Sequence, residues 1–175
     1  MKNFAVLLSA FVLIAFFACN EDADDTDRVE LTDETLVGEW RLVARETNFT
    51  SRIDGNLDET DTSTIGNSDH VYTYSADGTL SFTGWMSTYT TTDRRGVVTI
   101  DTSRWAYPLP GDGRWSIEGP STIIVAANTG YEYIINVIEF SESEMKTSQT
   151  FRYEVVDSFG KRTTISDVES TFEKN

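Results

Sequence analysis

The chain carries one thiol and one imidazole, so few reactions are open to it. His70 would need an activated serine beside it to act in a nucleophilic triad, and the G-x-S-x-G pattern that presents such a serine is absent. A zinc site would need carboxylates for nearly all of its ligands. Paired carboxylates could form a hydrolase site, but no two of the 29 acidic residues stand out. The sequence therefore predicts no enzyme, no metal and no cofactor, with His70 at a strand edge.

A second set of candidate ligands is the alternation of Asp54, Asn56 and Asp58, which matches the first ligands of a calcium loop. Glu59 stands where that loop requires its glycine, so calcium binding is the weaker interpretation. The surrounding segment 46–69 is rich in Asp, Thr, Ser, Asn and Gly. We expect it to be a long polar loop over one end of the fold.

Cys19 stands directly after a segment with the order of a secretory signal. Lys2 precedes an uncharged, mostly apolar run over 4–17, and the small residue Ala18 stands before the cysteine. The run has 14 residues, whereas a spanning helix needs about 20. The sequence predicts a cleaved signal over residues 1–18, and two alternatives remain for Cys19: a modified N-terminus, or a free thiol after ordinary cleavage near Ala18.

The ending Phe16-Phe17-Ala18-Cys19 resembles the lipobox of bacterial lipoproteins, although Phe16 replaces the commonest leucine. The resemblance implies that Cys19 is acylated and becomes the mature N-terminus. The following residues, 19–35, form an acidic segment that cannot bury enough apolar surface to fold alone, so we expect a flexible tether. Its start, 21–25, resembles the acidic export tag of Bacteroidetes-type lipoproteins. The two resemblances imply a protein of the bacterial outer membrane, facing either the periplasm or the cell surface.

The remaining residues, 36–175, are enough for one domain. Cys19 is the only cysteine, so no disulfide can stabilise this domain. The formal net charge of −15 leaves no basic face for nucleic acid and disfavours lying along an anionic membrane surface. We expect a monomer that attaches to the membrane through its N-terminal lipid.

Alternating apolar and polar residues predict strands through most of this domain. In 36–45, Trp40, Leu42 and Ala44 would point to one face and Arg45 to the other. Asp77-Gly78 is typical of a tight hairpin turn. Eight or nine regularly spaced strands with short connections predict an all-β fold, an antiparallel up-and-down barrel of about eight strands; a β-sandwich is the alternative.

Gly38-x-Trp40 at the start of the domain and the run Y-x-Y-S-x-D-G-T-L-x-F from residue 72 resemble bacterial lipocalin-like domains. In that family the tryptophan closes one end of the barrel beneath a basic side chain from the last strands. The resemblance implies that Gly38 and Trp40 form this closure and that either Arg152 or Arg162 supplies the basic group. The sequence does not decide between these two arginines.

Six aromatic residues in the middle of the chain are suited to a pocket, because Trp and Tyr combine large area with one polar group. They are Trp85, Tyr89, Trp105, Tyr107, Tyr131 and Tyr133. They could line a cavity for a small hydrophobic ligand or pack a filled core. The first case predicts a membrane-anchored ligand-binding protein of the cell envelope, and the second an adhesion or envelope-complex assembly module.

Overall fold

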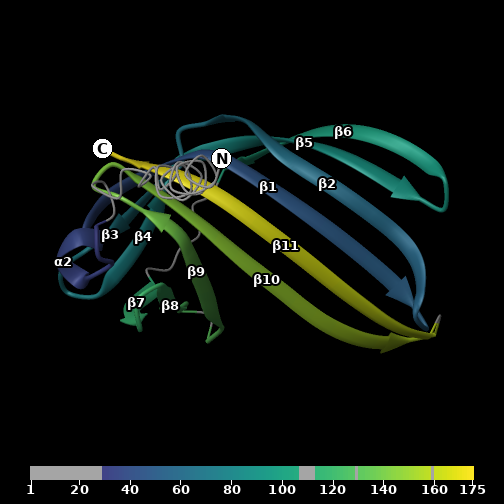
Figure 1. Ribbon diagram of the computed structural model, residues 1–175. Helices are drawn as coiled ribbons and strands as arrows, with labels where there is room; N and C mark the ends of the chain where they lie inside the picture. Colours follow the sequence, from purple (N-terminus) through teal and green to yellow (C-terminus); the bar gives the residue numbers. More distant parts are fainter. Residues whose placement is uncertain (1–28, 107–112, 129, 159) are drawn as a thin grey trace, which may run out of the picture.

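The computed structural model describes residues 29–106, 113–128, 130–158 and 160–175 (Figure 1). This part of the chain is almost entirely β-structure. Its elements are α2 (Asp33–Leu36), β1 (Gly38–Ile53), β2 (Asn56–Ser68), β3 (Val71–Tyr74), β4 (Thr79–Thr83), β5 (Trp85–Arg94), β6 (Val97–Ala106), β7 (Gly113–Glu118), β8 (Thr122–Ala126), β9 (Glu132–Phe140), β10 (Glu144–Asp157) and β11 (Gly160–Lys174). The predicted hairpin around Asp77-Gly78 forms, and a second hairpin turns at Arg95-Gly96.

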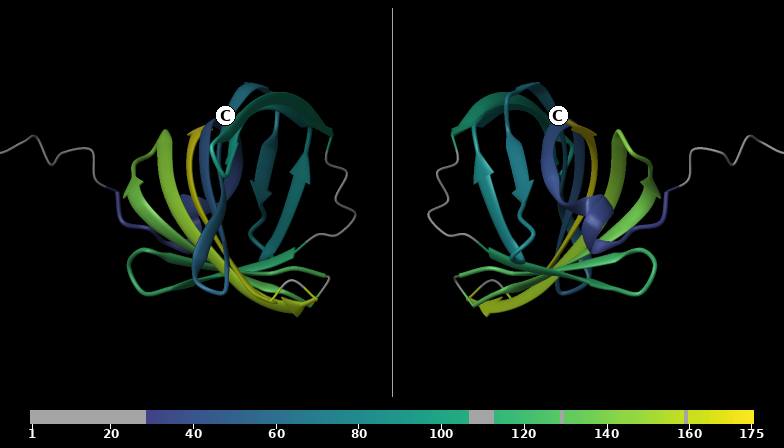
Figure 2. Two further views of the ribbon diagram at one scale, coloured as in Figure 1. Left: turned by 90° about the vertical axis from the view of Figure 1, so that its right-hand side faces the viewer. Right: turned by 90° about the vertical axis from the view of Figure 1, so that its left-hand side faces the viewer.

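Eight of the strands close into an antiparallel barrel. They follow the order β11-β10-β9-β8-β7-β4-β3-β1, and β1 pairs back with β11 to complete the ring (Figure 2). Apart from the closing pair β11–β1, barrel neighbours follow one another in the chain except where β2 and the β5–β6 hairpin are inserted. The thinnest junction is β4–β7, where only Thr79 and Leu80 pair across to β7 in the described register. The closed ring confirms the predicted all-β fold, an antiparallel barrel of about eight strands, and excludes the β-sandwich.

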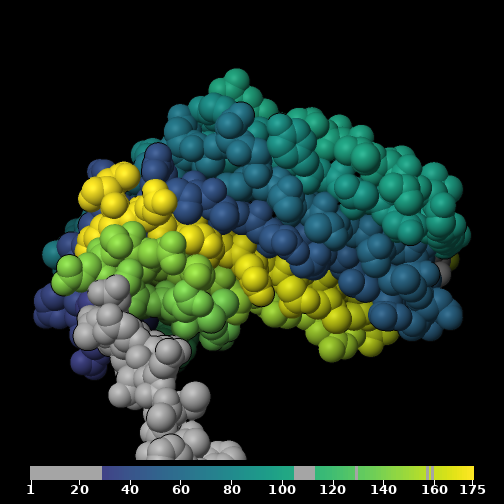
Figure 3. Space-filling model, turned by 45° about the horizontal axis from the view of Figure 1, so that its top comes forward, coloured from purple at the N-terminus to yellow at the C-terminus, as the bar shows by residue number. Residues whose placement is uncertain are grey.

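Three strands outside the ring form an extension that we call the wing: β2, β5 and β6. The first residues of β1 pair with β3, but from Glu46 to Ile53 the same edge of β1 pairs with β2. The long strands β10, β11 and β1 therefore run out of the barrel and continue sideways into the wing, as Figure 1 shows. In the space-filling view the same strands lie as adjacent bands (Figure 3).

The wing corrects the prediction of a long polar loop over 46–69. This segment consists of the second half of β1, a turn at Asp54-Gly55, and β2. The turn residues have φ angles of 49° and 83°, which is the conformation that Asp-Gly adopts in two-residue hairpins. Threonine and serine lie on both faces of β2, so its sequence lacks the alternation of apolar and polar residues that predicts a strand. The backbone pairing of a strand does not need this alternation.

In this segment, the two acidic residues of the calcium interpretation have other partners. Asp58 is 3% exposed at a register shift in β2. Its carboxylate accepts from Arg95, with Nη2 at 2.6 Å and Nε at 2.8 Å from Oδ1. Asp54 instead accepts from the backbone N–H of Lys161 at 2.9 Å. Within the described residues, no three His, Cys, Asp or Glu side chains form a group that could hold a metal ion.

A bulge in β1 changes which side chains face the barrel interior. Leu42 pairs with Phe172 and Ala44 pairs with Thr171, so Val43 is an extra residue without its own partner on β11. One extra residue reverses the faces of all residues that follow it. Arg45 therefore points inward, and Ala44 is exposed. The predicted alternation for residues 44 and 45 is wrong for this reason.

The apolar core lies at the end of the barrel nearest α2. Its most buried large side chains are Trp40, Tyr74, Leu36, Leu42, Leu80, Ile123 and Met145. Among the described residues, the core cluster runs from Leu31 to Phe172. Residues 20–175 contain this cluster, and we expect them to fold on their own.

The folded part begins before the expected boundary at residue 36. Leu31 is 6% exposed, and α2 begins at a capping box in which Thr32 and Thr35 bond each other's backbone N–H groups. The signal at 1–18, Cys19 and the tether up to residue 28 lie outside the described residues. None of the helices that the structure describes is long and apolar enough to cross a membrane.

Candidate ligand-binding cavity

The barrel contains a cavity of about 250 Å³. Seven of the eight barrel strands contribute to its lining, with β7 as the exception. The apolar and aromatic lining consists of Tyr72, Tyr74, Leu80, Phe82, Val125, Tyr133, Ile135, Phe151, Val168 and Phe172; the polar lining consists of Arg45, Thr47, His70, Thr147, Gln149 and Ser170. The barrel is hollow here, with an apolar wall and few polar groups.

One side of the cavity is closed by side chains instead of backbone hydrogen bonds. The register between β9 and β10 ends at Asn136 and Ser148, so the two strands separate beyond this point. Tyr133 and Phe151 face each other across the separation, with ring centroids 6.0 Å apart in an edge-to-face arrangement. This seam lies directly beside the cavity, because both rings line it.

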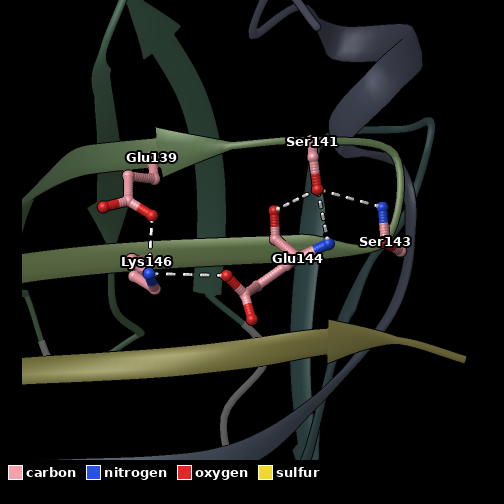
Figure 4. A network of polar contacts seen from close by, with 5 residues as sticks. All are labelled: Glu139, Ser141, Ser143, Glu144 and Lys146. Carbon is pink, nitrogen blue, oxygen red and sulfur yellow. Dashed lines mark hydrogen bonds and ion pairs between the residues drawn. The ribbon is translucent and has the colours of Figure 1, made fainter. Parts of the chain in front are cut away.

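The opposite end of the β9–β10 hairpin is tightly held (Figure 4). Ser141 Oγ accepts from the backbone N–H of Glu144 at 3.0 Å and of Ser143 at 3.4 Å. Lys146 Nζ pairs with Glu139 at 2.6 Å and with Glu144 at 3.6 Å. The turn at 141–144 therefore ties the two strands at one end only.

A polar cluster occupies one wall of the otherwise apolar cavity. Arg45 Nε donates to Ser170 Oγ at 3.1 Å, and Arg45 Nη2 donates to the Tyr72 hydroxyl at 3.0 Å. The Tyr72 ring packs edge-on against Phe82 and Phe172, with centroids 4.7 and 4.9 Å apart. The guanidinium is thus held by a side chain that is itself locked in the aromatic wall.

His70 lies next to this cluster, 4% exposed, with its ring centroid 4.9 Å from that of Tyr72. Burial lowers the pKa of His70 below its usual value, the charge of Arg45 lowers this pKa further, and Asp69 partly opposes both. The imidazole is therefore neutral near pH 7. His70 directly precedes β3, so it stands at the start of a strand, as predicted. The burial of its side chain was not predicted.

This depressed pKa has a consequence for stability. The unfolded chain binds a proton at His70 before the folded chain does, so the free energy of unfolding rises with pH between the folded pKa and about 6.5. We expect stability to fall more steeply in wild type than in His70→Gln when the pH is lowered from 7.5 to 5.5. Urea denaturation at both pH values measures this, and equal losses in the two proteins would contradict it.

The structure brings one of the predicted aromatic residues to the cavity. Tyr133 lines it, whereas Tyr131 is 69% exposed. Trp85 lies on the wing with the guanidinium carbon of Arg104 4.0 Å from its ring centroid. Tyr89 also lies on the wing, where its ring covers Gly66. Tyr107 and the side chain of Trp105 lie outside the described residues.

Trp40 lies in the core at the end of the barrel nearest α2. It is completely buried, and its Nε1 donates to the Leu36 carbonyl at 2.7 Å. Lys174 Nζ lies 5.1 Å from the centre of the indole and donates to the Thr35 carbonyl at 2.8 Å. A Cβ at Gly38 would come within 2.9 Å of Lys174 Cε, so glycine leaves the space that this lysine uses.

The basic partner of Trp40 was wrongly predicted. Lys174 pairs with Trp40 in the β1–β11 register, whereas Arg162 pairs with Ile53 at the far end of the same strands. Arg152 is exposed on β10 and forms an ion pair with Glu154 at 3.3 Å. Only the strand register decides which basic residue of the last strands reaches the tryptophan.

Sequence comparison assigns no family, because neither a family model nor a curated protein matches the chain. Among solved structures, the chain is similar to the S-type phycobiliprotein lyase CPES from Guillardia theta. The two share 10% sequence identity over 82% of this chain and 90% of that chain, with a TM-score of 0.28. The strand pairing defines the barrel, and the lining residues define its cavity.

Proposed function

We propose that the protein binds a small hydrophobic ligand inside its barrel while an acylated Cys19 holds it at the bacterial outer membrane. The observation that carries the ligand part is the cavity of 250 Å³ inside the closed ring. The signal-like segment before Cys19 supports the anchor. The two parts are independent, since either could fail without the other.

The lining supports a hydrophobic ligand. Ligand sites are concave, mostly apolar, and contain a few fixed polar groups that orient the ligand. Ten of the sixteen lining residues are apolar or aromatic, and the polar ones cluster around Arg45. The adhesion or assembly module that the sequence also allowed would need a filled core. A hollow barrel therefore favours ligand binding.

Filling the cavity tests this proposal. Val168 lines the cavity from β11, and its neighbour Glu169 is exposed on the other face of the same strand. We expect Val168→Trp to weaken binding of a neutral fluorescent lipophile, such as N-phenyl-1-naphthylamine, at least tenfold, whereas Glu169→Trp leaves it unchanged. Both variants are made in residues 20–175. Overpacking a core costs about 1–3 kcal/mol, so thermal unfolding is used to verify that each variant is folded.

Native mass spectrometry supplies a second measurement on the same protein. We expect a lipophile, either co-purified or added, to remain bound in wild type and in Glu169→Trp. Absence of any bound lipophile in wild type, or equal binding by the two tryptophan variants, would contradict ligand binding in the barrel.

A further inference from the structure

We propose that the cavity selects an amphipathic ligand with one carboxylate, which binds to Arg45 beside Tyr72 and Ser170 while its apolar chain fills the rest of the barrel. This inference rests on the proposed function, and it adds the chemical class of the ligand. Medium-chain fatty acids are the simplest members of this class.

The charge of the lining is the first argument. The whole chain has 29 acidic residues and a net charge of −15, but none of the described residues that line the cavity is Asp or Glu. With His70 neutral, Arg45 is the ionised side chain of the lining. An acidic protein thus has a cavity of positive charge, which attracts an anion and not a cation.

The second argument is the set of groups bound to Arg45. Its guanidinium donates to two hydroxyls, of Ser170 and Tyr72, and both acceptors are neutral. No carboxylate of the described residues pairs with it. By contrast, Arg41 on the same strand pairs with Glu173 at 2.7 Å. Other basic residues with carboxylate partners are Arg94, Arg95, Lys146, Arg152 and Lys161.

The chemistry of a guanidinium explains why a carboxylate would fit. Arginine stays charged at any physiological pH and has five N–H donors, of which the two hydroxyls use two. A planar carboxylate can accept two parallel bonds from such a group, and these charge-assisted bonds are stronger than bonds to a neutral oxygen. An alcohol offers one neutral oxygen and leaves the positive charge uncompensated.

The side chains around Arg45 suit the apolar chain of an amphipathic ligand. Tyr72 fixes the guanidinium from one side and is itself held between Phe82 and Phe172. Away from this wall, the lining contains aliphatic and aromatic side chains such as Val125 and Ile135. A ligand with its carboxylate at Arg45 would therefore place its apolar chain against apolar surface.

Competition between matched ligands tests the inference on residues 20–175. Decanoate and decan-1-ol have the same chain and differ in the head group, and each displaces N-phenyl-1-naphthylamine if it binds. We expect wild type to bind decanoate about 10–100-fold more tightly than the alcohol. Arg45→Met should remove most of this preference, whereas Arg41→Met, which breaks an exposed ion pair on the same strand, should retain it.

Equal affinity for the two ligands in wild type, or an unchanged preference in Arg45→Met, would overturn the carboxylate proposal while leaving ligand binding in place. If wild type binds neither the fluorescent lipophile nor either decyl compound, the proposed function itself fails, and this inference fails with it.

A second measurement needs no variant at Arg45. His70 is the only histidine of the chain, so its imidazole signals in an NMR titration need no assignment. Arg45 lowers the pKa of His70, and a carboxylate bound to Arg45 would offset that charge. We expect decanoate to raise the pKa of His70 and decan-1-ol to leave it unchanged; the same pKa with both compounds, at concentrations that displace the lipophile, would overturn the proposal.

Discussion

Replacing Trp40 by alanine is expected to lower the free energy of unfolding by about 3–5 kcal/mol, the usual range for truncating a buried aromatic residue. The indole is completely buried, and it packs against Phe140 with ring centroids 5.6 Å apart. Its N–H bonds the Leu36 carbonyl, and Lys174 lies over its face. The alanine variant loses all of these contacts and leaves a cavity at the closed end of the barrel.

Denaturant unfolding of residues 20–175 measures this difference, with an unchanged m-value as evidence that the folded state stays compact. Trp85→Ala is the matched control. That tryptophan is only partly buried on the wing, where its contact with Arg104 is worth about 0.5–1 kcal/mol. A loss below about 1 kcal/mol for Trp40→Ala would mean that Trp40 does not hold the barrel end together.

Replacing Cys19 by alanine is expected to abolish lipid attachment. Acyl chains anchor a protein because each buried methylene contributes about 0.8 kcal/mol, so a variant without them loses its hold on the bilayer. Metabolic labelling with an alkyne fatty acid measures this directly. We expect label on wild type and none on Cys19→Ala, and label that persists in the variant would contradict acylation at this cysteine.

Fractionation of cells needs a separate variant, because Cys19→Ala also retains the apolar segment 4–17 if cleavage depends on the cysteine. Replacing residues 1–19 by an ordinary cleavable secretory signal avoids this problem. We expect the resulting protein in the soluble fraction of the envelope and wild type in the membrane fraction. Membrane association without residues 1–19 would show that another part of the chain binds the bilayer.

Local patterns were sufficient to predict the barrel. Alternation around Trp40 and the tight turn at Asp77-Gly78 depend only on neighbouring residues, and the structure has a strand and a hairpin at these places. For Gly38 and Trp40, only the family resemblance implied a closure of the barrel end. In the structure, Gly38 leaves room for the lysine that lies over the indole.

The wing was not predictable from the same patterns. The strands β2 and β5 carry threonine and serine on both faces, so they lack the apolar period that reveals a half-buried strand. The β1–β2 and β5–β6 hairpins are local, but only the pairing of β2 with β5 joins them into one sheet. The Asp54-Gly55 turn was a local signal for the first hairpin, and the alternating acidic residues concealed it.

The sequence by itself determined the all-β class of the fold, because alternation and tight turns depend on short patterns. Only the tertiary structure decided what faces the cavity. The bulge at Val43 turns Arg45 inward, and the register of β11 selects Lys174 over Arg152 and Arg162 for Trp40. Both depend on pairing between strands more than a hundred residues apart, and a shift of one residue reverses every side chain.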